Sequence, residues 1–103
     1  MKKLIVNGTI VDGSGRAGYQ ANVLIEDERI AKIGDIQPEE GVEVIDAKGF
    51  IVAPGFIDTH SHSDLQILEN PEIQPKVRQG VTTEVLGQDG ISMAPLPVKY
   101  ISP

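Results

Sequence analysis

The first half of the chain alternates short aliphatic runs with polar turns that contain glycine. Val and Ile dominate these runs, and both residues pack well on a pleated sheet. Asn7-Gly8 is the strongest hairpin signal, because both residues tolerate positive φ. Similar turns at 27–28 and 48–49 predict two further hairpins. The pattern therefore predicts a small, mostly antiparallel sheet over residues 1–53.

A different pattern begins at Pro54, after which an apolar run leads directly into polar residues. Residues 55–60, GFIDTH, predict one strand, and residues 81–87, VTTEVLG, predict a second. A helix between them would complete a βαβ unit, in which the two strands are parallel. Parallel sheets are usually covered on both faces, so two such strands cannot build a core alone. The pattern predicts the start of a larger α/β domain over residues 54–103.

The crossover between these strands allows two interpretations. Asn70 could cap a helix that has Pro71 at its first position. Pro75 lies too deep for a clean helix of that kind, because proline removes a backbone donor. An irregular turn followed by a short helix over 75–79 is the alternative. Gly80 suits the left-handed position just past a helix end.

Composition and charge restrict the class of protein. Hydrophobic residues make up 40% of the 103 residues, which is ordinary for a globular protein. The net charge of -6 and the absence of a basic cluster argue against a nucleic-acid partner. There is no cysteine, so no disulfide or thiolate metal site is expected within these residues. No apolar run has the ~18 residues of a membrane span or the ~7–15 of a signal peptide. The cytoplasm is the expected location.

The two histidines of the chain carry its candidate chemistry. His60 and His62 close the strand predicted from residue 55, and period-two alternation places them on one face with Asp58. Two neutral imidazoles one step apart can bind one metal ion at about 2.0–2.1 Å. In α/β folds such sites lie at the carboxyl ends of parallel strands. Asp58 could orient an imidazole, or it could belong to a polar layer inside a barrel.

Four other polar side chains lie near these predicted strands. Asp89 follows the second strand, whose end should lie about 4.8 Å from that of the first, so it could join the histidines on a metal. An ordinary Asp-Gly turn is the alternative. Ser61 is disfavoured as a nucleophile, because alternation points it away from both histidines and no G-x-S-x-G surrounds it. Asp64 is expected to contact solvent or substrate or to cap a turn, and Glu84 has no assigned role.

The stretch PGFIDTHSH, residues 54–62, resembles the amidohydrolase superfamily. That family combines a distorted (β/α)8 barrel with a small β-sandwich, and its H-x-H closes the first barrel strand and binds metal. The resemblance implies the N-terminal part of the β-sandwich over 1–53 and the first βαβ of an α/β, TIM-like barrel over 54–103. Such a barrel needs about 250 residues. The later histidine ligands and the catalytic acid/base carboxylate are therefore expected beyond Pro103.

A second stretch, QGVTTEVLGQDGISMAPL at 79–96, resembles the D-aminoacylase, or N-acyl-D-amino-acid deacylase, branch. Its members carry a Gly-Val-Thr-Thr strand, a Gly-x-Cys-Gly turn whose Cys binds the metal, and a nearby Ala-Pro. Asp89 stands where that Cys would be. The resemblance implies one or two divalent ions, zinc first, bound by His60, His62 and Asp89. An Asp oxygen also admits manganese or iron. The implied reaction is hydrolysis of the amide of an N-acyl-D-amino acid.

Two alternatives remain open for the function. One is another amidohydrolase, such as a dihydroorotase or hydantoinase acting on a cyclic amide. The other is a non-catalytic metal-binding or β module, if 103 residues are the full product. The expected partners are a small-molecule substrate and the rest of its own chain, with no nucleic acid and no membrane. If the chain is expressed alone, its exposed strand edges predict self-association or partial disorder.

Overall fold

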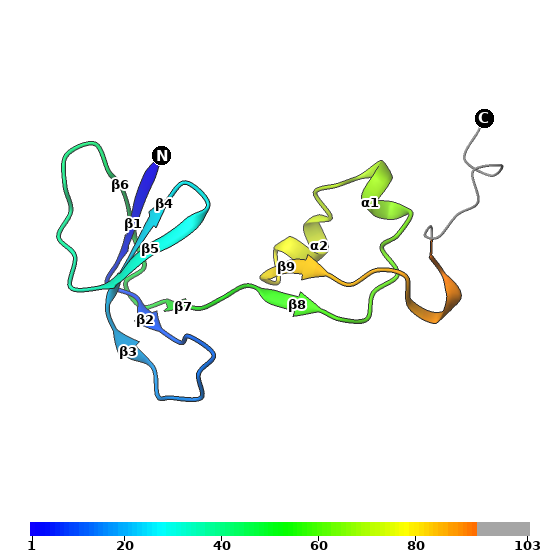
Figure 1. Cartoon of the computed structure of the whole chain (residues 1–103), viewed down its shortest axis with the longest axis horizontal. Coiled ribbons are helices and arrows are strands. Elements are labelled where there is room, and N and C mark those ends of the chain that lie inside the picture. Colours follow the sequence, from blue (N-terminus) through cyan, green and yellow to red (C-terminus); the bar gives the residue numbers. More distant parts are fainter. Residues whose placement is uncertain (93–103) are drawn as a thin grey trace. The chain divides into compact units, whose positions relative to one another are not determined.

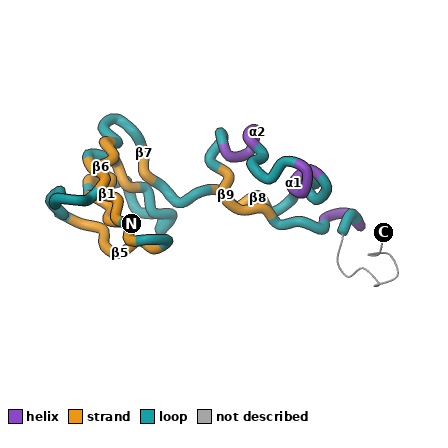
Figure 2. Tube along the Cα trace, turned by 90° about the horizontal axis from the view of Figure 1, so that it is seen from above, coloured by secondary structure: helices purple, strands orange, loops and turns teal. Residues whose placement is uncertain are grey.

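The computed structural model describes residues 1–92, which fall into two compact units (Figure 1). The first comprises Met1–Pro54 and the second begins at Gly55. Strands and turns build the first unit, whereas the second combines two strands with short helices (Figure 2). None of the helices in residues 1–92 is long and apolar enough to cross a membrane. The Ala-Pro pair at 94–95, part of the deacylase resemblance, lies outside the described residues.

The first unit contains two sheets. The four-stranded sheet has the order β5-β4-β1-β6, in which β4 is antiparallel to β1 and β5, and β6 is parallel to β1. The three-stranded sheet has the order β3-β2-β7, with β2 antiparallel to β3 and parallel to β7. The strands are β1 (Lys2–Val6), β2 (Thr9–Ile10), β3 (Tyr19–Gln20), β4 (Asn22–Glu26), β5 (Arg29–Gly34), β6 (Glu43–Asp46) and β7 (Ile51–Val52).

One of the three predicted hairpins is confirmed, and two are wrong. The turn at 27–28 joins β4 to β5 as an antiparallel pair. Asn7 does adopt the left-handed conformation, with φ 61°, but it separates β1 from β2, which belong to different sheets. The turn at 48–49 likewise separates β6 from β7. Instead, β1 pairs in parallel with β6, and β2 pairs in parallel with β7. Residues 1–53 therefore form two mixed sheets and not the single, mostly antiparallel sheet that was expected.

Contacts between the two turns explain this arrangement. The side-chain amide of Asn7 donates to Asp46 Oδ1 at 2.9 Å, which ties the end of β1 to the end of β6. A Cβ on Gly8 would lie 2.5 Å from Val52 Cγ2, so only glycine allows β7 to approach this closely. The core of the unit is aliphatic, as the composition predicted. Its buried members are Leu4, Val6, Ile10, Val23 and Ala47.

The second unit contains the predicted βαβ arrangement. Strands β8 (Phe56–Asp58) and β9 (Val81–Glu84) pair in parallel, and Asp58 and Glu84 are register partners. The crossover carries two short helices, α1 (Gln66–Glu69) and α2 (Gln74–Val77). A 3-10 turn, η1 (Gln88–Gly90), follows β9. The carboxyl ends of β8 and β9 therefore meet at one edge, as the site hypothesis requires.

The crossover differs in detail from both interpretations of its sequence. Asn70 is the C-cap of α1, so the expected N-cap role is wrong. Pro75 lies in the first turn of α2, where its missing N–H leaves no hydrogen bond unmade. The helix therefore begins at Gln74 and ends at Val77. Gly80 follows it with φ 83°, which confirms the predicted left-handed glycine.

Close packing at the start of β8 predicts that Gly55→Ala destabilises the second unit. A Cβ on Gly55 would lie 2.2 Å from both Oγ1 and Cγ2 of Thr82, its neighbour on β9. Overpacking of this kind typically costs about 1–3 kcal/mol. Denaturant unfolding of the wild type and the variant measures the loss. The double variant Gly55→Ala/Thr82→Ala removes the two closest atoms and should recover part of it. Equal stability of wild type and Gly55→Ala would contradict the close approach.

Candidate metal centre

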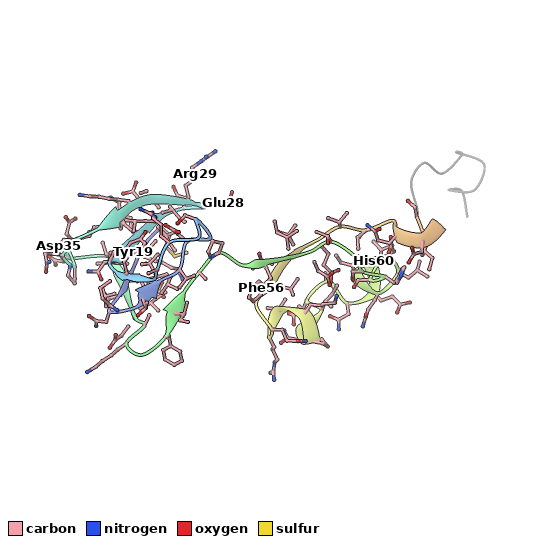
Figure 3. All side chains as sticks on the ribbon, turned by 90° about the horizontal axis from the view of Figure 1, so that it is seen from below. Tyr19, Glu28, Arg29, Asp35, Phe56 and His60 are labelled. Carbon is pink, nitrogen blue, oxygen red and sulfur yellow. The ribbon has the colours of Figure 1, made fainter. Side chains whose placement is uncertain are left out.

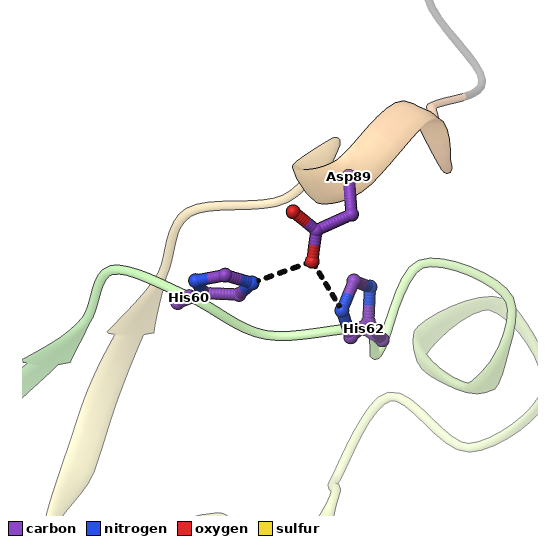
Figure 4. A group of neighbouring side chains, drawn as sticks. All are labelled: His60, His62 and Asp89. Carbon is purple, nitrogen blue, oxygen red and sulfur yellow. Dashed lines mark hydrogen bonds and ion pairs between the residues drawn. The ribbon is translucent and has the colours of Figure 1, made fainter.

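The two strand ends of the second unit position three polar side chains. His60 and His62 lie in the loop after β8, and Asp89 lies in η1 after β9 (Figure 4). In Figure 3, the labels on Phe56 and His60 mark the start of β8 and the loop that follows it. The predicted strand over 55–60 is too long, because β8 ends at Asp58. The histidines share a direction through their loop and not through strand alternation.

The three side chains converge on one point. His60 Nε2 lies 2.8 Å from Asp89 Oδ2, and His62 Nε2 lies 3.2 Å from the same oxygen. The imidazole rings are 5.5 Å apart, in an edge-to-face arrangement. All three side chains are exposed, at 62%, 45% and 62% respectively. The structure thus brings together the three residues that the sequence predicted as metal ligands.

The donor atoms fit a divalent metal ion. Two nitrogens and one oxygen lie within 4.8 Å of one another. Ligand atoms on a tetrahedral zinc ion are about 3.3–3.5 Å apart, given zinc–ligand distances of about 2.0–2.1 Å. The observed separations of 2.8 and 3.2 Å need only a small outward movement of exposed side chains to reach this range.

The backbone around Asp89 is unusual and directs its carboxylate toward the histidines. Asp89 has φ 54°, between Gly87 at 85° and Gly90 at 81°. Asp is among the few non-glycine residues that adopt this left-handed region with any frequency. The Asp-Gly turn that the sequence allows as an alternative is therefore present, and the same turn carries the carboxylate to the site.

Asp58 has a different contact from the one expected. Its Oδ1 accepts the backbone N–H of His60 at 3.1 Å, so it fixes the loop and does not contact the ring. Its Oδ2 forms an ion pair with Lys76 of α2. The hydrogen bond from Lys76 and then that from the His60 N–H lower the pKa of Asp58. The same bond to Asp58 raises the pKa of Lys76.

Asp64 and Ser61 are both buried, at 2% and 5% exposure. Asp64 Oδ1 accepts the backbone N–H of Gly87 at 3.0 Å, so it caps the turn before η1 and does not face solvent. Ser61 Oγ contacts Ser63 Oγ at 3.0 Å and also Lys76, and its hydrogen bonds within residues 1–92 include none to an imidazole. This arrangement agrees with the rejection of Ser61 as a nucleophile.

Sequence reasoning left Glu84 without a role and missed Lys76, and both residues lie beside the site. The Glu84 side chain is only 9% exposed, and its Oε1 lies 3.2 Å from Lys76 Nζ. The sequence did contain a signal for them, namely a carboxylate inside a predicted strand, Glu84, and a lysine in the crossover, Lys76. The signal does not show that the two meet, because that depends on how the crossover folds back onto β9.

Comparisons with known proteins place the chain in a family. The model of the amidohydrolase family matches residues 43–99, more than half of the chain, and the chain belongs to this family. It is 46% identical over 98 residues to the N-acyl-D-aspartate deacylase of Alcaligenes xylosoxydans xylosoxydans, covering 95% of this chain and 20% of that enzyme. The chain thus spans about a fifth of the length of the curated relatives it matches.

A solved structure supports the same placement. The N-acyl-D-glutamate deacylase from Bordetella bronchiseptica, complexed with zinc and a phosphonate inhibitor, superposes with a TM-score of 0.85 and 44% identity over 92% of this chain and 20% of that chain. The D-hydantoinase of Geobacillus stearothermophilus is 52% identical, but over only 63% of this chain and 13% of its own length. These findings confirm the predicted resemblance to the deacylase branch.

Proposed function

We propose that these residues are the N-terminal segment of a metal-dependent hydrolase that cleaves the amide of N-acyl-D-amino acids. His60, His62 and Asp89 are its metal ligands contributed by this segment, and zinc is the first candidate ion. The convergence of three donor atoms within 4.8 Å, from the ends of two neighbouring parallel strands, carries this proposal. The similarity to deacylases over most of the chain supports the substrate class.

The proposed domain assignment is the one that the family resemblance implies. On this proposal, residues 1–53 belong to the N-terminal part of a small β-sandwich, and the segment 54–103 contains the first βαβ of an α/β, TIM-like barrel. The two mixed sheets of the first unit and the parallel pair β8–β9 of the second support this division. In barrels of this type, active sites lie at the carboxyl ends of the strands, where His60, His62 and Asp89 lie here.

The donor set suits amide hydrolysis. A bound divalent ion would polarise the amide carbonyl and lower the pKa of a water molecule. His60 and His62 would hold the ion through Nε2, and Asp89 would contribute a carboxylate oxygen, Oδ2. Protonation of the leaving amine needs an acid/base group. The family resemblance places that carboxylate beyond Pro103.

The carboxylate of Asp89 is compatible with a wider range of metal ions than a thiolate at the same position would be. Zinc, manganese and iron all accept a ligand set of two imidazoles and a carboxylate, whereas a thiolate favours zinc and other softer ions. The zinc in the related N-acyl-D-glutamate deacylase supports zinc as the first ion to test.

Two other functions are separable by experiment. A hydantoinase or dihydroorotase is the nearest enzymatic alternative, and its similarity extends over a smaller part of the chain. A non-catalytic metal-binding or β module is the other. An immunoblot of source cells tests the module hypothesis, because it measures the size of the natural protein. A band near 11.1 kDa would mean that the protein is too small to contain a barrel.

The activity test uses the full-length protein that contains these residues. We expect turnover of N-acetyl-D-aspartate, N-acetyl-D-glutamate or another N-acetyl-D-amino acid, and none of the L-enantiomers, hydantoin or dihydroorotate. Removal of metal by a chelator should abolish turnover, and zinc should restore it, because the ion would supply the Lewis acid that polarises the amide carbonyl. Turnover of a cyclic amide without turnover of any N-acyl-D-amino acid would reject the deacylase assignment.

A further inference from the structure

Lys76 of α2 connects the ends of β8 and β9 with the loop that carries His60 and His62, here called the histidine loop. Its ammonium forms an ion pair with Asp58 Oδ2 at the end of β8. It lies 3.2 Å from Glu84 Oε1 at the end of β9. It also donates to Ser61 Oγ at 3.2 Å, and Ser61 stands between the two histidines in the chain. One cation therefore contacts all three segments that hold the site.

The two carboxylates require such a cation. Asp58 and Glu84 are register partners on adjacent parallel strands, which are typically about 4.8 Å apart. Glu84 is nearly removed from water, with its side chain 9% exposed. Two like charges this close repel, and a buried carboxylate is costly unless it is paired. Within residues 1–92, Lys76 is the cation in contact with both carboxylates.

The same network holds the backbone of the histidine loop on both sides. Asp58 binds Lys76 through Oδ2 and the His60 N–H through Oδ1. Ser63, which follows His62, donates to Glu84 Oε1 at 3.3 Å. The imidazoles are exposed, so packing around the rings does not hold them. The hydrogen bonds of Asp58 and Ser63 hold the loop that carries them.

We propose that Lys76 is a positioning residue for the metal centre, which keeps the ends of β8 and β9 together and so sets the spacing of His60, His62 and Asp89. The proposal rests on the assignment of these three residues as metal ligands. Lys76 does not itself contact the ligand side chains. Without its charge, Asp58 and Glu84 repel each other, and the loop loses the anchor that aligns its imidazoles before the metal binds.

The test is a cobalt titration of the full-length, metal-free protein, followed by the visible absorption of the bound ion. We expect Lys76→Met to weaken Co²⁺ binding about 10–100-fold and to alter the absorption bands, since residues that support metal ligands have effects of this size. Lys32→Met is the matched control, because Lys32 is exposed on β5 in the first unit. It should bind Co²⁺ as the wild type does.

A second variant tests the positioning role of Lys76 if Lys76→Met does not fold. Lys76→Met/Glu84→Met removes the buried carboxylate together with its partner, and it too should bind Co²⁺ at least about 10-fold more weakly than the wild type. Wild-type affinity and an unchanged spectrum in either folded variant would overturn the positioning role alone. Wild-type binding in His60→Ala would instead reject the ligand assignment, and the positioning role with it.

Discussion

Replacing His60 with alanine is expected to abolish most metal binding and most hydrolysis in the full-length protein, and His62→Ala should do the same. Each imidazole supplies one of the three donor atoms that converge within 4.8 Å. Loss of a residue that merely supports a ligand typically costs about 10–100-fold in metal affinity. Loss of a ligand itself should exceed that range, because a methyl group cannot replace the nitrogen.

Metal content after dialysis and kcat/KM for an N-acetyl-D-amino acid measure the two effects. Thr59→Ala is the matched control, because Thr59 is exposed in the same loop and lies next to His60 in the chain. The control should retain both metal and activity. If His60→Ala and His62→Ala both retain full metal content and wild-type turnover, these residues are not the ligands and the proposed centre is wrong.

The three residues of the site could be predicted from the sequence because their positions depend on strand order. A βαβ unit brings the residues after its two strands to one edge of the sheet, and this holds even when the strand lengths are misjudged. Strand β8 ends at Asp58, so the alternation argument for His60 and His62 was wrong, although both imidazoles do meet Asp89. What brought Asp89 to them was the parallel pairing of β8 with β9.

The contacts that could not be predicted are those between segments far apart in the sequence. Asn7-Gly8 specifies a left-handed turn, but which strand pairs with β1 depends on β6, which begins at Glu43. The burial of Glu84 depends on a lysine that reaches it from α2. Local sequence patterns indicate turns and periodicity. They do not indicate which strand pairs with which, or which charged side chains meet.

Asp89→Cys is expected to change the metal preference of the centre. A thiolate is a softer ligand than a carboxylate, so the variant should gain affinity for cadmium and zinc and lose affinity for manganese. We expect the ratio of the manganese to the cadmium dissociation constant to rise by more than about 10-fold, on the difference in ligand softness. The φ of 54° at residue 89 is less favourable for Cys than for Asp, so part of this gain is offset by backbone strain.

Competition between cadmium and manganese for the metal-free protein measures the ratio, and a thiolate-to-cobalt absorption band reports whether the new sulfur binds the ion. Gln88→Cys is the matched control, because it places a thiol in the same 3-10 turn one residue away from the carboxylate that faces the histidines. The control should keep the wild-type ratio and show no such band. If Asp89→Cys behaves like Gln88→Cys, residue 89 does not ligate the metal. In that case, the 2.8 and 3.2 Å contacts of Asp89 with the two imidazoles belong to the metal-free protein only.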